Sequence, residues 1–444
     1  MNAGEVWPGK SAFPSLIYIP MKKIDSKRLI KTFLELLKID GPTFKERAVA
    51  DYLLQQFSRL GISGDEDGAG SVIGGDCGNL LFRMPGRRAS RPELVFCSHL
   101  DTIVSTRGVK VVEKDGVFSS SGDSIIGADD RGGVATMLEL ARALVESGGS
   151  PVPVRFLFTV AEETGLLGVK QLRPEWAAGG IAFVLDSSGP VGSVVNRAPF
   201  AVKIRAVIKG RAAHSGIEPE AGVNAVVISS RAIAGMRLGR VDFETTANIG
   251  IIKGGEAINI VPDRVELLGE ARSLDRDKMK KQVLKMERVL RDSAAEEGGE
   301  VEFSFQSDYP GFAIPETSKE IALVREAAEK LSLPFLLAAS GGGSDANILN
   351  SLGLTALNLS TGMARPHSPG EHIARDDLIR LGNLLLAIVE RAAGSMQGHR
   401  AGEMALTKDR AEKISVMRSK KIVKGKNILS RPRRNAKKSE QVWK

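Results

Sequence analysis

Apolar positions along the chain follow two different spacings. Helical spacing, with apolar residues every three or four positions, predicts helices over residues 25–39 and 44–60. Short and almost wholly apolar runs at 94–97, 154–160 and 181–185 predict buried strands. Because such strands alternate with helices, we expect an α/β fold with a mainly parallel sheet that is covered on both faces.

The pattern changes near residue 197. Four strand-like runs and two helical runs then alternate over about a hundred residues, which predicts a small α+β domain inserted into the main one. The α/β pattern resumes with a helix at 317–331, a strand at 354–360 and a last helix at about 375–393. The predicted organisation is an N-terminal extension (1–21), a first part of the main domain (22–196), an inserted domain (197–307), a second part of the main domain (308–397) and a basic C-terminal tail (398–444).

The net charge of +9 comes from one end of the chain. Residues 401–444 hold 14 Lys and Arg against four Asp and Glu, so this tail contributes +10 and the remainder carries −1. We expect the tail to be a disordered, solvated extension, with binding to nucleic acid as the lesser alternative. At the other end, Met21 is an alternative start of the protein.

Composition restricts the class of protein. With only Cys77 and Cys97, the chain has no disulfide framework, and we expect a cytoplasmic location. Cys97 lies two residues before His99, where it is either a metal ligand or, as we favour, a buried core thiol. The chain has no run of eighteen apolar residues, so we expect no membrane partner.

One histidine and several carboxylates stand where predicted strands end or a helix begins. Ligands of parallel sheets gather at the carboxyl ends of the strands. Zinc takes imidazole nitrogen and carboxylate oxygen, and a pair of zinc ions needs a bridging carboxylate. The candidate ligands are His99, Asp129, Glu163, Asp186 and His367. The sequence therefore predicts a site for two zinc ions and a water.

Two neighbouring carboxylates have predicted supporting roles. Asp101 is two residues from His99 and would orient it or its metal, and Glu162 would be the general base. An isolated acidic pair is more often a solvated turn or helix start, and a single histidine after a strand is more often structural. The joint pattern favours the metal site, because each cluster follows or adjoins an apolar strand.

Four segments carry a resemblance to a known family. SHLDT at 98–102, GADD at 127–130, AEETGLLG at 161–168 and LD at 185–186 resemble the motifs of the M20 metallopeptidases. The chain is most similar to the peptidase T (tripeptidase) branch and its relatives, over roughly residues 22–395. The resemblance implies that the main domain is catalytic and that the inserted one is a lid or dimerisation domain.

The resemblance also implies how the ligands are shared. It assigns His99 and Asp186 to different metals, with Asp129 bridging both and with Glu163 and His367 completing the two sites. Family sites usually hold two zinc ions, with cobalt or manganese as alternatives. Members often have a cis peptide after the bridging aspartate, here Asp129-Asp130.

The last histidine ligand has a competitor. His372 lies close to His367, which we favour because the family's histidine precedes the last helix and is often followed by a glutamate, here Glu371.

Further residues match substrate-contacting positions of the family. His214 would polarise the substrate carbonyl, and Asn259 and Arg272 would contact the substrate, Arg272 through a carboxylate. The alternative for Arg272 is a surface arginine at a strand end. Gly343 and Ser344 lie in a glycine-rich loop, and the resemblance implies that this loop faces the substrate.

The leading function is a dinuclear zinc aminopeptidase that hydrolyses the N-terminal peptide bond of short peptides, such as tripeptides. An amidohydrolase that removes an acyl group from an N-acyl amino acid is the alternative, because the same metal core performs both reactions. A binding protein on a hydrolase scaffold, with a tail that binds nucleic acid, is the lower alternative. The partners expected are a short peptide and a second copy bound through the inserted domain.

Overall fold

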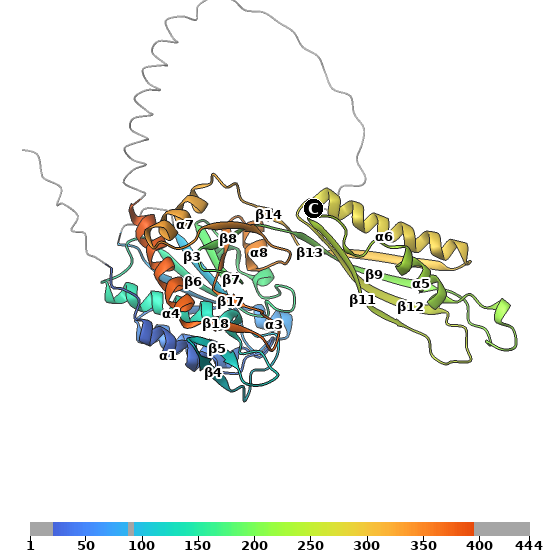
Figure 1. The fold of residues 1–444 in the computed structure, drawn as a ribbon, viewed down its shortest axis with the longest axis horizontal. Helices are drawn as coiled ribbons and strands as arrows, with labels where there is room; N and C mark the ends of the chain where they lie inside the picture. Colours follow the sequence, from blue (N-terminus) through green and yellow to red (C-terminus); the bar gives the residue numbers. More distant parts are fainter. Residues whose placement is uncertain (1–20, 88–92, 395–444) are drawn as a thin grey trace, which may run out of the picture. The chain divides into compact units, whose positions relative to one another are not determined.

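The computed structural model describes residues 21–87 and 93–394. Most of the expected N-terminal extension and the whole basic tail lie outside these residues. Two sheets with separate sets of helices, together with one small sheet, make up the described chain (Figure 1).

A nine-stranded mixed sheet forms the centre of the first group of elements. Its inner strands β6, β3, β7 and β16 run parallel, and the outer pairs are antiparallel, except that β15 lies parallel to β8. The strand order is β1 (Gly64–Glu66), β2 (Leu80–Met84), β6 (Val154–Thr159), β3 (Leu94–His99), β7 (Ile181–Ser187), β16 (Thr355–Ser360), β8 (Ser193–Ala198) and β14 (Phe312–Ala313), with β15 (Leu336–Ala339) also on β8. The predicted α/β class with a parallel central sheet is confirmed.

Aromatic rings fill one face of this sheet. Phe57 of α2 (Arg47–Arg59) stacks on Phe82 of β2 and also contacts Phe158 of β6. On the same side, α4 (Ala128–Glu146) packs against β3 and β7, and α1 (Ser26–Leu36) packs against α4. Burial of these rings anchors the helices that begin beside the site.

A second apolar cluster covers the opposite face. Val95 and Cys97 of β3 and Val184 of β7 pack there with Trp176 and with Ile348 of α8. Cys97 is therefore a buried core thiol, as expected. The elements near this cluster are η1 (Val169–Gln171), η2 (Pro174–Trp176) and α8 (Asp345–Ser351). Two further helices of this group are α3 (Ala69–Ile73) and α7 (Lys319–Lys330).

A five-stranded antiparallel sheet with two long helices forms the second group. The strand order is β10 (Gly239–Arg240), β11 (Thr245–Gly254), β12 (Arg264–Ser273), β9 (Phe200–Lys209) and β13 (Glu300–Tyr309). The helices α5 (Ala225–Gly235) and α6 (Arg276–Glu296) pack on one face of the sheet (Figure 1), and η3 (Pro219–Ala221) lies in a connection. This arrangement fits the expected α+β insertion; its exact boundaries at 197 and 307 stay a prediction.

A small four-stranded antiparallel sheet was not predicted. It pairs β17 (Met363–Ala364), β18 (His372–Ala374), β5 (Val117–Ser120) and β4 (Val111–Lys114) in that order. Because β18 pairs with β5, the loop between β17 and β18 is held close to residues far earlier in the chain.

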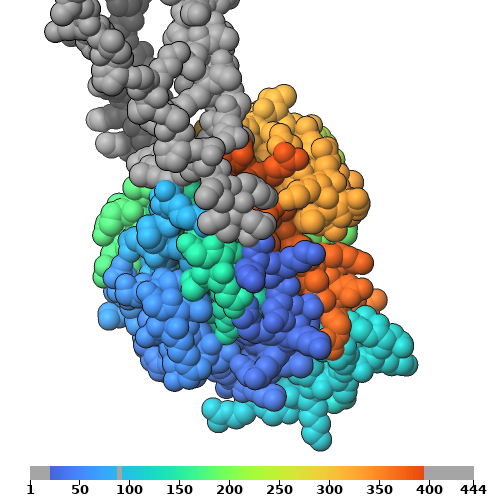
Figure 2. All heavy atoms as spheres, turned by 90° about the vertical axis from the view of Figure 1, so that its left-hand side faces the viewer, coloured from blue at the N-terminus to red at the C-terminus, as the bar shows by residue number. Residues whose placement is uncertain are grey.

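Residues 375–394 form the last described helix. A side chain added at Gly382 would meet Ile24 and Leu29, so this helix packs against the start of the described chain. Figure 2 shows the two ends, blue and orange-red, side by side on one face. None of the described helices is long and apolar enough to span a bilayer.

Candidate metal centre

His99 is the last residue of β3, where it ends level with Thr159 of β6. Its Nδ1 lies 3.0 Å from the backbone oxygen of Asp101, and because a carbonyl only accepts, Nδ1 carries the proton. Its Nε2 faces two carboxylates, 3.1 Å from Asp129 Oδ1 and 3.8 Å from Asp186 Oδ1. Burial opposes the charged form of His99, but the hydrogen bonds with Asp101 and Asp129 outweigh it and raise its pKa well above the usual value.

Asp129 stands at the start of α4, after the connection that follows β5. Its two oxygens point to different histidines: Oδ1 lies 3.1 Å from His99 Nε2, and Oδ2 lies 3.2 Å from His367 Nε2. The turn is held by Glu371, whose carboxylate accepts the backbone N–H groups of Gly127 and Asp129 at 2.8 and 2.9 Å. The peptide bond between Asp129 and Asp130 is cis, as the resemblance implied.

Glu163 and His367 form the other side of the cluster. His367 Nε2 lies 2.8 Å from Glu163 Oε2, and the hydrogen bonds with Asp129 and Glu163 raise the pKa of His367 to about 10. The side chain of His367 is 46% exposed. The competitor His372 instead turns its Nδ1 to the backbone oxygen of Gly370, at 2.8 Å. The geometry therefore supports His367 as the candidate ligand.

Glu162 and Asp186 are close to His99, on the side of the cluster opposite to His367. One oxygen of each carboxylate and one nitrogen of His99 lie within 4.8 Å of one another. Burial raises the pKa of both carboxyl groups well above the usual value, and repulsion from neighbouring carboxylates adds to it. The backbone of Asp186 is fixed by Asn358, which accepts from its N–H and donates to its carbonyl, both at 3.1 Å.

Asp101 holds other residues in place besides His99. Its carboxylate accepts the backbone N–H groups of Glu162 and Glu163 at 3.0 and 3.2 Å and the hydroxyl of Thr43 at 2.8 Å. Ala161, just before the acidic pair, has a left-handed φ of 50°, so the chain bends sharply where Asp101 holds it. Asp101 thus fixes the backbone of both glutamates and, through a 3.4 Å contact, His99.

The distances group the candidate ligands differently from the expectation. His99 and Asp186 lie on the same side of Asp129, and Glu163 and His367 lie on the other. The assignment of His99 and Asp186 to different metals does not fit this geometry, because their donor atoms are only 3.8 Å apart.

The donor set fits a pair of cations. Four carboxylates and two histidines converge, and in the neutral form of His99, with Nδ1 protonated toward Asp101, Nε2 offers a lone pair toward carboxylate oxygens. Lone pairs that face one another repel unless a proton or a metal ion lies between them. Nitrogen and oxygen donors are those that zinc prefers.

His214 and Asn259 are neighbours in the inserted segment. The backbone N–H of Ser215 donates to the carbonyl of Asn259 at 3.0 Å, and His214 forms a bridge with Ile260. His214 is exposed, and its Nδ1 accepts from the backbone N–H of Gly216 at 3.2 Å. The structure thus brings these two predicted residues together, and no described contact links them to the cluster around Asp129.

Arg272, Tyr309 and the glycine-rich loop form another group. A Cβ atom at Gly343 would lie 2.5 Å from Cζ of Tyr309, so the ring packs directly under this glycine. Arg272 donates to Glu270 at 2.8 Å, while its Nε and the hydroxyl of Tyr309 are buried without a hydrogen-bond partner among the described residues. Ser344 is buried, and its backbone N–H donates to the side chain of Asn347 at the start of α8.

Sequence reasoning missed three buried carboxylates beside the cluster. Glu371 was used only as a spacing marker, but it holds the turn that carries Asp129. Asp130 accepts the hydroxyl of Ser98, and Asp345 accepts that of Thr159. Burial raises the pKa of Asp345 to about 6. None of the three follows an apolar strand, because Asp130 lies in the first turn of α4, Asp345 begins α8 and Glu371 precedes β18, so the apolar pattern did not mark them.

This chain is similar to known proteins over most of its length. The sequence profile of Peptidase family M20/M25/M40 matches residues 95–391. The protein named "Uncharacterized protein YqjE" from Bacillus subtilis (strain 168) is 40% identical over 370 residues, which cover 83% of this chain and 100% of that protein.

Two solved structures are similar over nearly their whole length. The aminopeptidase PepT from Bacillus cereus ATCC 10987 has a TM-score of 0.77 at 39% identity, and a tripeptidase from Staphylococcus aureus subsp. aureus Mu50 has a TM-score of 0.80 at 38% identity. Each comparison covers 83% of this chain and 99% of the other.

Proposed function

Because this chain belongs to Peptidase family M20/M25/M40, we propose that it is a metal-dependent aminopeptidase that releases the N-terminal residue of short peptides, such as tripeptides. The observation that carries the proposal is the pair of histidines that face opposite oxygens of Asp129. The similar aminopeptidase and tripeptidase structures support the substrate class.

Two zinc ions are the proposed cofactors. His99, Asp129 and Asp186 would hold one, and Asp129, Glu163 and His367 would hold the other, a grouping supported by the distances between their donor atoms. Cobalt and manganese remain the alternatives. When bound, the pair would make water more acidic and polarise a peptide carbonyl.

Glu162 is the proposed general base. Its carboxylate lies beside His99 and Asp186, and burial raises its pKa, which makes the carboxylate a stronger base. It would take a proton from the attacking water and pass it to the leaving amine. Asp101 would keep the backbone of Glu162 in place through the hydrogen bond at 3.0 Å.

The other predicted residues would bind the peptide. Arg272 would grip the terminal carboxylate beside the loop of Gly343 and Ser344, and a buried unpaired Nε supports a role in binding an anion. His214 would polarise the scissile carbonyl, with Asn259 next to it. Closure of the inserted domain would be needed if His214 acts within its own subunit.

A homodimer through the inserted domain is a further part of the proposal. On the outer side of β11, only Thr246 and Ala247 pair with β10, so the rest of this strand is an edge among the described residues. Such an edge can add a strand from a second copy. Light scattering of the purified protein would test it.

The acyl-amino-acid amidohydrolase is not favoured, because both solved structures at 38% and 39% identity are named as peptidases. The test uses a tripeptide and the same tripeptide with an acetylated N-terminus. We expect the zinc-loaded protein to release the N-terminal residue of the free tripeptide only. Preference for the acetylated peptide would contradict the proposal.

A matched pair of variants tests the base. We expect Glu162→Gln to lower kcat about 10²- to 10⁴-fold while both zinc ions remain bound. Glu175→Gln, which changes an exposed glutamate in η2, should keep full activity. Turnover by Glu162→Gln at the wild-type rate would refute the assignment.

A further inference from the structure

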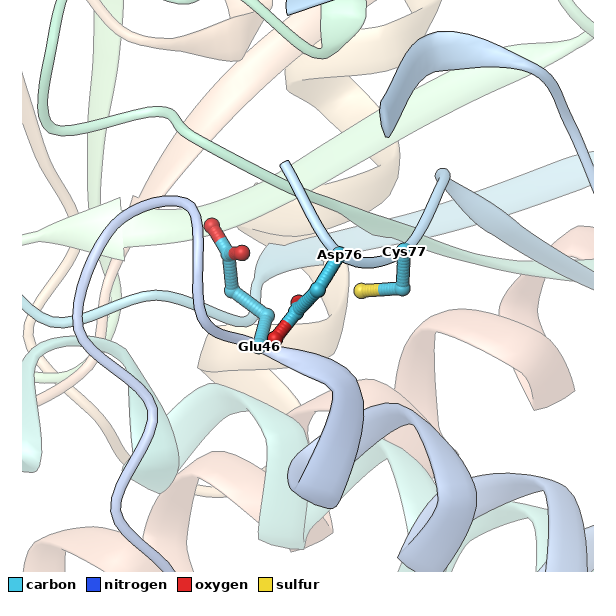
Figure 3. A group of neighbouring side chains, drawn as sticks. All are labelled: Glu46, Asp76 and Cys77. Carbon is cyan, nitrogen blue, oxygen red and sulfur yellow. The ribbon is translucent and has the colours of Figure 1, made fainter. Parts of the chain in front are cut away.

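Three metal-binding side chains gather outside the proposed active site. They are Glu46, just before α2, and Asp76 and Cys77, in the connection between α3 and β2 (Figure 3). Each offers one oxygen or sulfur atom, and these atoms lie within 4.8 Å of one another. The cluster shares no residue with the candidate ligands of the active site.

Glu46 supplies an independent sign of a missing ligand. The residue is 0% exposed, and its Oε1 accepts the backbone N–H groups of Phe44 and Ala161, both at 3.0 Å. Its Oε2 is buried and has no hydrogen-bond partner among the described residues. A buried carboxylate oxygen without a partner costs free energy, which a bound cation would remove.

We propose that Glu46, Asp76 and Cys77 bind a divalent cation of the zinc class. The donor set decides the class, because a thiolate suits zinc and its neighbours, whereas magnesium and calcium take oxygen ligands. Zinc–ligand bonds of about 2.0–2.3 Å place donors roughly 3.5 Å apart, so small side-chain shifts complete the site. Asp76 is exposed, so an ion reaches the cluster from solvent and can keep a water.

The charges around the cluster are compatible with a cation. Two positive side chains lie close to the cluster: Arg47, which pairs with Glu66 at 2.5 Å and Asp51 at 3.1 Å and also interacts with Cys77, and the buried Arg131, whose charge acts on Glu46. The carboxylates of Glu46, Asp76 and Glu66 offset these charges. Its backbone N–H donates to Asp76 Oδ1 at 3.0 Å and fixes that carboxylate. Burial raises the pKa of Cys77 to about 12, so the metal must displace the thiol proton, which passes to solvent.

A bound ion would join parts of the chain that lead to the active site. It would tie the segment of Asp76 and Cys77 to the start of α2. The same glutamate holds the N–H of Ala161, next to the proposed base Glu162. The site is therefore structural, and it makes the zinc content of the protein three per chain if the proposed function holds.

Cobalt substitution tests this site separately from the active site. The proposed active-site ligands offer only nitrogen and oxygen, so a thiolate-to-cobalt charge-transfer band in the near ultraviolet reports Cys77 alone. The protein is stripped with chelator, loaded with Co²⁺ without oxygen, desalted and measured for absorbance and for metal per chain.

We expect the band in the wild type and in Cys97→Ser, which changes the other buried cysteine. Cys77→Ser should lose the band and one cobalt per chain while the remaining cobalt stays bound. Asp76→Asn, at an exposed position, should weaken the band even if Cys77→Ser does not fold. A wild type without the band, or a Cys77→Ser variant with unchanged metal content, would overturn the proposal. A wild type that shows the band but binds no cobalt beyond this one ion would instead count against the proposed function.

Discussion

Replacement of Asp101 by asparagine tests how the acidic cluster is organised. Oδ2 of Asp101 accepts from Thr43 Oγ1 and Glu163 N, and Oδ1 accepts from Glu162 N and lies 3.4 Å from His99 Nδ1. Asparagine keeps one oxygen and turns the other into an NH₂ group. In either orientation, that group faces a backbone N–H that has lost its acceptor.

The cost follows from the number of bonds affected. A hydrogen bond to a charged group contributes about 1.5–3 kcal/mol, and a buried donor without a partner costs about 1–3 kcal/mol. Because Asp101 is 0% exposed, solvent does not screen these interactions. We expect Asp101→Asn to lower the free energy of unfolding by about 3 kcal/mol and the zinc affinity by about 10- to 100-fold.

The pH dependence of this difference has a definite sign. Burial disfavours the carboxylate of Asp101, but hydrogen bonds from His99, Thr43 and Glu162 outweigh it and hold its pKa below the usual value. A lowered pKa in the folded state means that the stabilisation is complete above the unfolded value of about 3.9 and is lost only as the pH falls below it. The deficit of the variant should therefore be constant between pH 5 and pH 8.

Urea unfolding and zinc titration of the two proteins measure both effects. Thr43→Val is the control, because it removes one hydroxyl and leaves both backbone N–H groups bound to Asp101, so its deficit should be about 1 kcal/mol. An Asp101→Asn protein with the unfolding midpoint and zinc affinity of the wild type would refute the reasoning.

Three further predictions use single positions. Gly343→Ala should raise KM for a tripeptide, because the new Cβ meets an aromatic ring at 2.5 Å, while Gly341→Ala, with nothing within 4 Å, should leave KM unchanged. His367→Ala should retain one zinc per chain fewer than His372→Ala after dialysis, as measured by mass spectrometry; equal contents would contradict this, and a lower content in His372→Ala would favour the competitor. The pKa of Glu46 is raised to about 7, chiefly by burial, so wild-type stability should fall as the pH rises from about 4 to 7. We expect Glu46→Gln to be more stable than the wild type by about 3 kcal/mol at pH 8 and equally stable below pH 4, with both proteins treated with the same chelator. Free energies of unfolding that change in parallel with pH in the two proteins would contradict this.

The strands that carry the site could be predicted, because they are buried on both faces and read as continuous apolar runs. The predicted strands at 94–97, 154–160 and 181–185 correspond to β3, β6 and β7. The prediction ended the first strand two residues early, since the polar residues Ser98 and His99 follow the apolar run. In the structure His99 still pairs with Thr159 and so belongs to the strand.

The small sheet could not be predicted in the same way. Its strand β5 has one fully buried apolar residue, Phe118, and is otherwise partly exposed, so the apolar pattern is weak. Its partner β18 lies more than 250 residues later, and Ile373 pairs with Phe118. This long-range pairing holds the loop of His367 and Glu371 near Asp129, which local sequence patterns do not report.

Side-chain contacts separate two kinds of buried carboxylate that look alike in the sequence. Asp101 and Glu371 use their oxygens to accept backbone N–H groups, so their lone pairs are already occupied. Asp129 and Glu163 instead turn oxygens toward histidine nitrogens, where a cation can replace a proton. Only the second kind can bind metal without releasing the chain that positions it. The same distinction marks Glu46, which uses one oxygen for the backbone and leaves the other free, and for that reason its cluster is the place to search for a third ion.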